Sequence, residues 1–270
     1  MDPTKLAHIQ VGETEVPLFK RDISCIQILH GHTGKVLCCS FDFSGGTLAT
    51  GSDDGEIRLW RVVSDEWRCV KTLELGPAVT ACQFQASGAG GMLCTGSADN
   101  AVRVWKALKG DCVAVMNGHK DCVSCVSYDP LNNDVMCSGS QDATVRVWKA
   151  STQKQTRIFE GDKGHKSPVL SVSYNPNGDL IIAGAQDKTL RLWSARNGNL
   201  VTIMKGHDGP VHAVAFHTQN EWVVSGGKDK HLRAWRESGL PSHLASASCI
   251  FLLTVTTTTS PCCGFLQGSF

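Results

Sequence analysis

The chain has 270 residues, with 26 Lys and Arg against 25 Asp and Glu, and a formal net charge of +1. A balance of this kind produces no global field that would attract nucleic acid or an anionic membrane, so we expect neither as a partner. The N-terminus shows no basic n-region and no apolar h-region, and the 13 cysteines suit a reducing compartment. We therefore expect a cytoplasmic or nuclear protein.

The first 22 residues form a lead-in that contains no repeat. HIQV (8–11) and VPLF (16–19) are candidate strands on either side of Gly12. The next segment, Ser24–Leu29 (SCIQIL), matches the apolar segments that precede later Gly-His pairs. We expect it to be an outermost strand that arrives before its own unit and closes the array.

The region 23–237 is written as five units that end in IRLW, VRVW, VRVW, LRLW and LRAW. The spacings between the terminal tryptophans are 45, 43, 45 and 42 residues. Each unit contains short apolar runs of strand length, separated by Gly, Pro, Asn, Asp and Ser. Such a period predicts an all-β fold, a β-propeller of four-stranded antiparallel blades. The units span residues 23–60, 68–105, 112–148, 156–193 and 200–235.

Polar residues recur at fixed distances before the terminal tryptophans. Asp stands six residues before and Arg two before in every unit, Gly-His 28 or 29 before in four, and Ser eight before in three. In the second unit, Pro77 takes the His position, so Asp99 must find another donor. These positions hold His32, Ser52, Asp54, Trp60, Ser97, Asp99, Trp105, His119, Ser140, Asp142, Trp148, His165, Asp187, Trp193, His207, Asp229 and Trp235.

The recurring set resembles the WD-repeat family over about residues 23–235. The resemblance implies that a hydrogen-bonded His–Ser–Asp–Trp set stitches each blade. Because family propellers most often have seven blades, it also implies an incomplete, shortened seven-bladed ring, with a true five-bladed ring as the alternative. The second letter of the family's Trp-Asp dipeptide is missing, since Arg, Lys, Lys, Ser and Arg follow the tryptophans.

The same residue types also form hydrolase triads, which makes catalysis the alternative interpretation. An enzyme needs one such site, however, and repetition in successive units indicates a structural part. A buried Asp is costly unless hydrogen-bonded, and His, Ser and indole donors would satisfy it. No cluster of acids, His or a nucleophile stands outside the recurring positions. We therefore expect no catalytic residues, no metal and no cofactor.

The cysteines also fall on strand positions. Cys38, Cys39, Cys82 and Cys125 lie on expected first strands, Cys94 and Cys137 on second strands, and Cys25, Cys69 and Cys112 on outer strands. Other units hold Ala, Val, Ser or Ile there, so all of these cysteines are interpreted as small core residues. The Cys122–Cys125 pair has metal or redox spacing, but no second pair completes a zinc site.

The tail, residues 238–270, contains no Asp, Glu, Lys or Arg and none of the repeat positions, and we expect it to be poorly ordered. Its apolar run, CIFLLTV (249–255), is too short to span a bilayer. The fifth unit has three recognisable strands. Its fourth strand could come from Ser24–Leu29, from CIFLLTV, or from neither.

The loops that enter each first strand and link the second to the third strand should gather on one face. Lys163, Lys188 and Lys205 give the last two units a local basic bias. A solvated mixed-charge surface is one interpretation, and docking of an acidic peptide is the other. Variable positions on these loops are Lys35, Asp53, Asp121, Lys166, Gln186, Asp208, Lys228 and Lys230.

We therefore predict a non-catalytic protein-interaction scaffold or adaptor whose partners are other proteins or peptides, with an acidic segment as one candidate. Two alternatives stay open. One is a substrate receptor that binds ubiquitin-ligase subunits, and the other is a propeller enzyme.

Overall fold

A computed structural model describes residues 10–11, 14–15, 25–86, 91–217, 222–237 and 247–254. The chain divides into two units, Met1–His30 and Gly31–Phe270. In the first unit, β1 (Gln10–Val11) pairs antiparallel with β2 (Thr14–Glu15). β1 overlaps the predicted strand HIQV, whereas VPLF lies outside the described residues.

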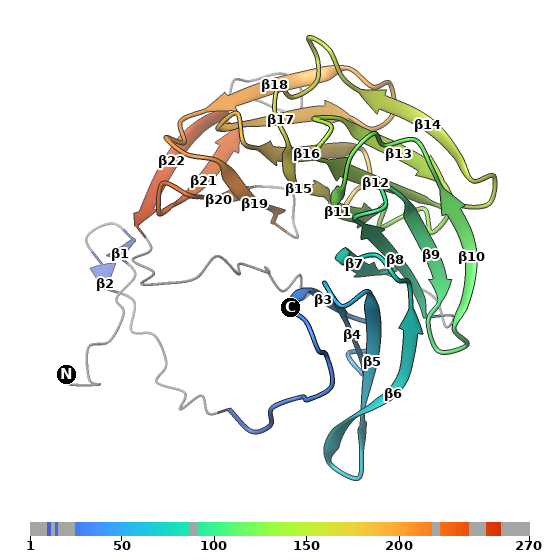
Figure 1. The fold of residues 1–270 in the computed structure, drawn as a ribbon. Coiled ribbons are helices and arrows are strands. Elements are labelled where there is room, and N and C mark those ends of the chain that lie inside the picture. The colour runs from blue at the N-terminus through green and yellow to red at the C-terminus, as the bar shows by residue number, and fades with distance from the viewer. Residues whose placement is uncertain are drawn as a thin grey trace. The chain divides into compact units, whose positions relative to one another are not determined.

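The second unit contains five four-stranded antiparallel sheets, which follow one another in chain order (Figure 1). We call these sheets blades one to five. The described residues contain no α-helix and no membrane-spanning helix, and the all-β propeller prediction is confirmed.

The strand bounds repeat closely from blade to blade. Blade one has β3 (Val36–Phe41), β4 (Thr47–Ser52), β5 (Glu56–Val63) and β6 (Glu66–Glu74). Blade two has β7 (Val79–Phe84), β8 (Met92–Ser97), β9 (Val102–Lys106) and β10 (Asp111–Met116). Blade three has β11 (Val123–Tyr128), β12 (Val135–Ser140), β13 (Val145–Lys149) and β14 (Lys154–Phe159). Blade four has β15 (Val169–Tyr174), β16 (Leu180–Ala185), β17 (Thr189–Ser194) and β18 (Leu200–Lys205). Blade five has β19 (Val211–Phe216), β20 (Val223–Gly227), β21 (His231–Glu237) and β22 (Ala247–Thr254).

The hydrophobic core lies between successive blades rather than in one central mass. One cluster joins Val102, Val104 and Met116 of blade two to Met136 and Trp148 of blade three. Equivalent clusters form between blades one and two, three and four, and four and five. Blades two, three and four bury both faces in this way, and blades one and five bury the face toward their one neighbour, which is why the strands are rich in Val, Ile, Leu and Trp. The repeated apolar runs of the sequence therefore cover the blade interfaces.

The first strands of all five blades line one common cavity of about 180 Å³. Each blade then proceeds from this inner strand to an outer fourth strand (Figure 1). The same order of strands and connecting turns recurs in every blade. The loops at each end of one blade therefore recur at the same end of the next blade. This repetition positions the candidate site described below.

The fourth strand of blade five comes from the tail. β22 pairs antiparallel with β21, with His231 opposite Thr254 and Glu237 opposite Ala247. The expectation that Ser24–Leu29 forms an outermost strand was wrong for residues 25–29, which are in no strand, while Ser24 lies outside the described residues. The tail follows β21 directly, and a short connection costs less loop-closure entropy than one across the whole array. Residues 247–254 of the tail form this strand, and the rest of 238–270 lies outside the described residues.

The cysteines divide by strand position. Cys94 and Cys137 of the second strands are buried, and burial raises the pKa of both thiols. Burial also raises the pKa of Cys125 to about 12, against hydrogen bonds with Ser124 and Gly139. The expectation of a core role was wrong for the other group, since Cys25, Cys69 and Cys112 are exposed. Cys69 of β6 and Cys112 of β10 occupy solvent-facing positions of fourth strands, and Cys25 is in no strand, so the small size of these side chains does not indicate burial.

Candidate interaction surface

A chain of hydrogen bonds crosses blades one, three and five. In blade three, the indole N–H of Trp148 donates to Ser138 Oγ (2.7 Å), Ser138 Oγ lies 2.7 Å from His119 Nε2, and His119 Nδ1 lies 2.9 Å from Asp142 Oδ2. Thr50 in blade one and Ser225 in blade five hold the same place as Ser138. We call this arrangement the Trp–hydroxyl–His–Asp bridge. It ties the third strand to the second strand and to the loop that precedes the first strand.

The aspartate is the acceptor at the end of each bridge. Asp142 accepts hydrogen bonds from the amides of Lys120 and Thr144, at 2.9 Å each, as well as from His119. Its burial would raise its pKa, but the bonds from His119, Thr144 and the Lys120 amide hold that pKa well below its usual range. The equivalent Asp229 of blade five has a pKa lowered to about 2, where the bonds from His207 and two amides outweigh burial. Both carboxylates are therefore ionised and fully bonded in the folded protein.

The serines predicted for this set do not belong to the bridge. Ser52, Ser97 and Ser140 stand eight residues before the tryptophan, whereas the hydroxyls that accept the indole N–H, those of Thr50, Thr95, Ser138 and Ser225, stand ten before it. In the structure the predicted serines accept hydrogen bonds from the amides of Asp54, Asp99 and Asp142, and so cap the turn between the second and third strands. The column of hydroxyls ten residues before the tryptophan could have been found, because it is filled in four units of five.

Blades two and four depart from the pattern in different ways. In blade two, where Pro77 replaces His, Asp99 pairs with Arg103 (Nη1 to Oδ1, 3.0 Å) and its pKa is lowered to about 2, chiefly by that arginine. In blade four, Ala183 occupies the hydroxyl position. His165 still lies 2.9 Å from Asp187, but its buried Nε2 has no hydrogen-bond partner among the described residues. The Trp193 indole donates instead to the Lys163 carbonyl at 2.8 Å.

The bridge has the connectivity of a hydrolase triad, hydroxyl to His to Asp. Its hydroxyls are nevertheless out of reach of any substrate, since Ser138 is 0% and Ser225 1% exposed. The indole N–H also occupies an acceptor site of each hydroxyl. The arrangement is therefore a structural hydrogen-bond network, and its hydroxyls are not placed to act as nucleophiles.

One group of side chains has metal-ligating types. Ligand atoms of His32, Asp54 and Glu56 lie within 4.8 Å of one another. These atoms already have protein partners, because His32 Nδ1 lies 3.0 Å from Asp54 and Glu56 forms an ion pair with Arg58 at 2.8 Å. The group is one end of the blade-one bridge, and it gives no reason to expect a bound ion.

The loops predicted to share a face do lie together within each blade. A backbone N–H seven residues before the tryptophan donates to a carbonyl at the entrance of the first strand, as in Asp53 to Lys35 (3.0 Å) and Lys228 to Pro210 (2.8 Å). The same bond recurs in the other three blades. The structure thus brings the two loops of each blade to the same end. All eight predicted partner-binding residues are exposed there: Lys35, Asp53, Asp121, Lys166, Gln186, Asp208, Lys228 and Lys230.

Several of these residues are engaged with neighbours. The Lys35 amide donates to Asp53 Oδ1 at 2.5 Å, and the Cys122 amide donates to Asp121 Oδ1 at 2.7 Å. Lys166 Nζ contacts Asp162 at 3.2 Å and the Gly161 carbonyl at 2.8 Å. Such exposed pairs contribute little energy, but they reduce the charge that a partner would meet.

The turn between the second and third strands contains one residue in a left-handed conformation. In blades one and two this position holds Gly55 (φ 82°) and Asn100 (φ 70°), the residue types that tolerate it, and in blade three it holds Ala143 (φ 65°). Blades four and five place Lys188 (φ 65°) and Lys230 (φ 67°) there. Both lysines are exposed. Every blade has a residue in this conformation at the same position, so blades four and five differ from the others in the charge of that residue and not in the backbone.

Lys188, Lys228 and Lys230 form a set that we call the basic face. Within the described residues, no ion pair joins any of them to a carboxylate. His212, at the wall of the central cavity, has a pKa lowered by burial and by the positive charge of Lys228. Asp208 is exposed on the same loops, and its negative charge partly offsets the positive charge of these lysines.

The sequence of the repeating blade matches that of known proteins. The profile of the family "WD domain, G-beta repeat" matches residues 23–61, 67–106, 110–149, 153–194 and 198–236. The chain belongs to the WD40 repeat family. The predicted resemblance to WD-repeat proteins is thereby confirmed.

Among curated relatives of this WD40 protein is the guanine nucleotide-binding protein subunit beta of Arabidopsis thaliana, 29% identical over 176 residues. That match covers 62% of this chain and 46% of the relative. The subunit beta of Solanum tuberosum is 28% identical over 169 residues, covering 60% and 45%. The human ribosome biogenesis protein BOP1 is 39% identical over 62 residues, covering 23% of this chain and 8% of its own. The chain thus spans less than half the length of these curated relatives.

Proposed function

We propose that this WD40 protein is a non-catalytic interaction scaffold that binds an acidic segment of a partner protein through the basic face of blades four and five. The observation that carries the proposal is the pair of exposed lysines, Lys188 and Lys230, at the turn position where the first three blades hold the uncharged Gly55, Asn100 and Ala143. Lys228 adds a third unpaired cation two residues from Lys230.

The scaffold part of the proposal follows from the fold. Backbone hydrogen bonds at the entrance of every blade hold the loops on rigid sheets, and loops on a rigid support are where binding residues concentrate. The polar sets that resemble catalytic groups are buried within the blades. The relatives named as subunit beta are, by that name, parts of an assembly, which agrees with an interaction role. The narrower role of a ubiquitin-ligase receptor has no supporting observation, and we do not propose it.

The electrostatic part follows from the distribution of charge. With a net charge of +1, the whole protein attracts no anion at long range, so attraction must be local. Lys166 is a weaker contributor than its position suggested, since Asp162 pairs with it. Lys188, Lys228 and Lys230 are exposed and form no ion pair among the described residues, so they are available to a carboxylate-rich peptide.

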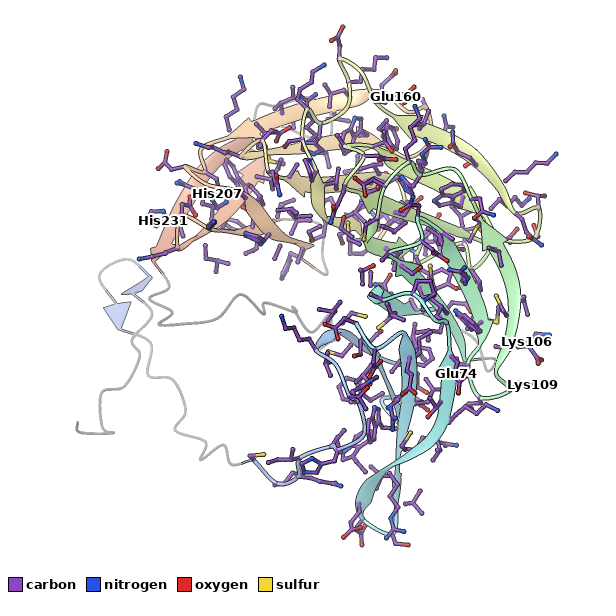
Figure 2. The ribbon with its side chains drawn as sticks, in the orientation of Figure 1. Glu74, Lys106, Lys109, Glu160, His207 and His231 are labelled. Atoms are coloured by element: carbon purple, nitrogen blue, oxygen red, sulfur yellow. The ribbon has the colours of Figure 1, made fainter. Side chains whose placement is uncertain are left out.

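The test is the affinity of a short fluorescein-labelled poly-glutamate peptide, measured by fluorescence anisotropy. Lys228→Glu with Lys230→Glu should weaken binding by roughly tenfold or more, because it replaces attraction by repulsion at the contact. The matched control is Lys106→Glu with Lys109→Glu, which changes net charge equally. Figure 2 shows Lys106 and Lys109 together near the turn between β9 and β10, and both are exposed.

The control pair should change the affinity by less than about twofold, because charges farther away than a Debye length are screened at physiological salt. Equal losses for both pairs would mean that the peptide senses only bulk charge, and that would overturn the proposed site. Unchanged unfolding curves for all variants show that the effect is on binding.

A further inference from the structure

Successive blades are joined by a repeated knob-into-hole contact. The first residue of each inner strand is a valine, and it fills the space beside a glycine on the second strand of the preceding blade. A Cβ built on Gly96 would lie 2.6 Å from Val123 Cγ1, and one built on Gly139 would lie 2.5 Å from Val169 Cγ1. The pairs Gly51 with Val79 and Gly184 with Val211 show the same approach. Only glycine leaves room for the valine, so each blade interface depends on this pair of residues.

The knobs are fully buried wherever a preceding blade exists. Val79, Val123, Val169 and Val211 are each 0% exposed. The corresponding residue of blade one, Val36, is 47% exposed. Phe41, at the other end of the same strand, is 40% exposed, whereas its counterparts Phe84 and Tyr128 are 5% and 4% exposed. Among the described residues, blade one therefore presents the knob side of a blade interface without the matching hole.

Blade five presents the other half. Gly226 stands nine residues before its tryptophan, as Gly96, Gly139 and Gly184 do in their own blades. Those three glycines are buried, while Gly226 is half-buried, and Val224 is half-buried where Cys94 of blade two is 0% exposed. The chain thus carries both halves of one interface, and its own Val36 remains exposed.

We propose that the knob side of blade one binds the hole side of blade five in a second copy of this chain. The chain already forms this knob-into-hole interface four times, between its successive blades, and the proposed contact continues the same series. The contact is heterologous, since one copy gives Val36 and the other gives Gly226, so each dimer retains one free knob and one free hole. Self-association is consequently expected to continue beyond two copies as concentration rises.

The test compares sedimentation of the full-length chain over a range of concentrations. The wild type should form dimers and larger species. Val36→Asp places a charge in the apolar knob-into-hole contact, and Gly226→Val fills the hole. Each of these variants should remain monomeric. Val62→Asp is the control, because Val62 is 52% exposed on β5 and takes no part in the knob-into-hole contact. It should self-associate as the wild type does.

The decisive sample is an equal mixture of the two monomeric variants. The Val36→Asp chain has an intact hole and the Gly226→Val chain an intact knob, so the mixture should form a dimer that grows no further. A thermal melt of each variant reports folding, and Gly226→Ala, which adds only one methyl group, replaces Gly226→Val if the larger residue lowers the melting temperature. A monomeric wild type, which would mean that the two sides meet within one chain, would overturn the proposal. So would a mixture that stays monomeric.

Discussion

At the scale of single residues, the aspartate of a bridge is the group on which most hydrogen bonds converge. Asp142 is 5% exposed at its side chain and accepts bonds from His119, Thr144 and two amides. Asp142→Ala should lower the free energy of unfolding by about 2–4 kcal/mol, because it leaves these donors buried without an acceptor. Chemical denaturation measures the loss.

Asp99→Ala is the comparison within the same protein. Asp99 is 28% exposed and its partner Arg103 18% exposed, so water can replace the lost contacts. We expect a loss of about 1 kcal/mol there, in the range of a partly exposed ion pair. Equal losses for the two variants would contradict the assignment of Asp142 to a buried bridge.

The hydroxyl position allows a test in both directions. Ser138→Ala should lower stability by about 1–3 kcal/mol, because His119 Nε2 and the Trp148 indole lose their shared partner. Ala183→Ser should raise stability by about 1 kcal/mol, since it supplies a hydroxyl near the unpartnered Nε2 of His165. Urea denaturation of both variants is the measurement. Destabilisation by Ala183→Ser would show that blade four has no room for the missing hydroxyl.

Protonation of a bridge histidine gives a prediction in pH. Burial lowers the pKa of His207, against the opposing effect of Asp229, and the positive charges of Arg233 and His231 lower it further. Figure 2 shows His207 and His231 on blade five. A folded-state pKa below the unfolded value of about 6.5 means that neutral His207 stabilises the fold fully above that pH, and that this contribution decreases as the pH falls below it.

The stability difference between wild type and His207→Gln should therefore be constant from about pH 8 to 7 and shrink toward pH 5. The lowered pKa values of Asp99 and Asp229, about 2, place the loss of their contributions between about pH 4 and 2, outside this window. A difference that grows on acidification would mean that Asp229 dominates and raises the pKa of His207 instead.

Sequence reasoning located the His, Asp and Trp positions but placed the hydroxyl two residues too late. Residues two apart on a strand face the same side, so periodicity cannot distinguish Ser140 from Ser138. The difference lies in depth along the strand. Ser138 lies level with the indole of Trp148, while Ser140 is at the turn and caps the Asp142 amide. Only the three-dimensional register separates these roles.

At the scale of elements, the tryptophan-anchored strands were predictable because each carries its own apolar pattern and turn residues. The fourth strand of blade five was not. Ser24–Leu29 and residues 249–255 are both short apolar runs, and their sequences do not state which edge they pair with. The structure pairs β22 with β21 and so gives the tail a role in the last blade.

Deletion of residues 238–270 tests that pairing. Without β22, amides of β21 that donate to it lose their partners, and their hydrogen exchange should accelerate by roughly tenfold or more. Deletion of residues 1–29 should leave β21 exchange unchanged, since β21 has its neighbours β20 and β22 without them. Fast exchange after the N-terminal deletion, with none after the C-terminal one, would instead establish the N-terminal segment as the outer strand of blade five.

At the scale of the whole molecule, a nearly neutral protein presents two surfaces that differ in chemistry. The basic face is polar and formed by turn residues of blades four and five. The knob side of blade one and the hole side of blade five are apolar and formed by strand residues. They share no residue. Variants such as Lys228→Glu with Lys230→Glu, and Val36→Asp, should therefore separate partner binding from self-association.

The most direct test of the scaffold account is to map where an acidic peptide binds, by following backbone amide shifts in the NMR spectrum of the Val36→Asp chain, a variant expected to be monomeric. On titration with poly-glutamate peptide, the largest shifts should come from residues 186–188 and 228–230, the turns that carry the basic face. These shifts should shrink at high salt, because the contact is between exposed charges. Shifts concentrated near Lys106 and Lys109, or spread evenly over all five blades, would contradict it.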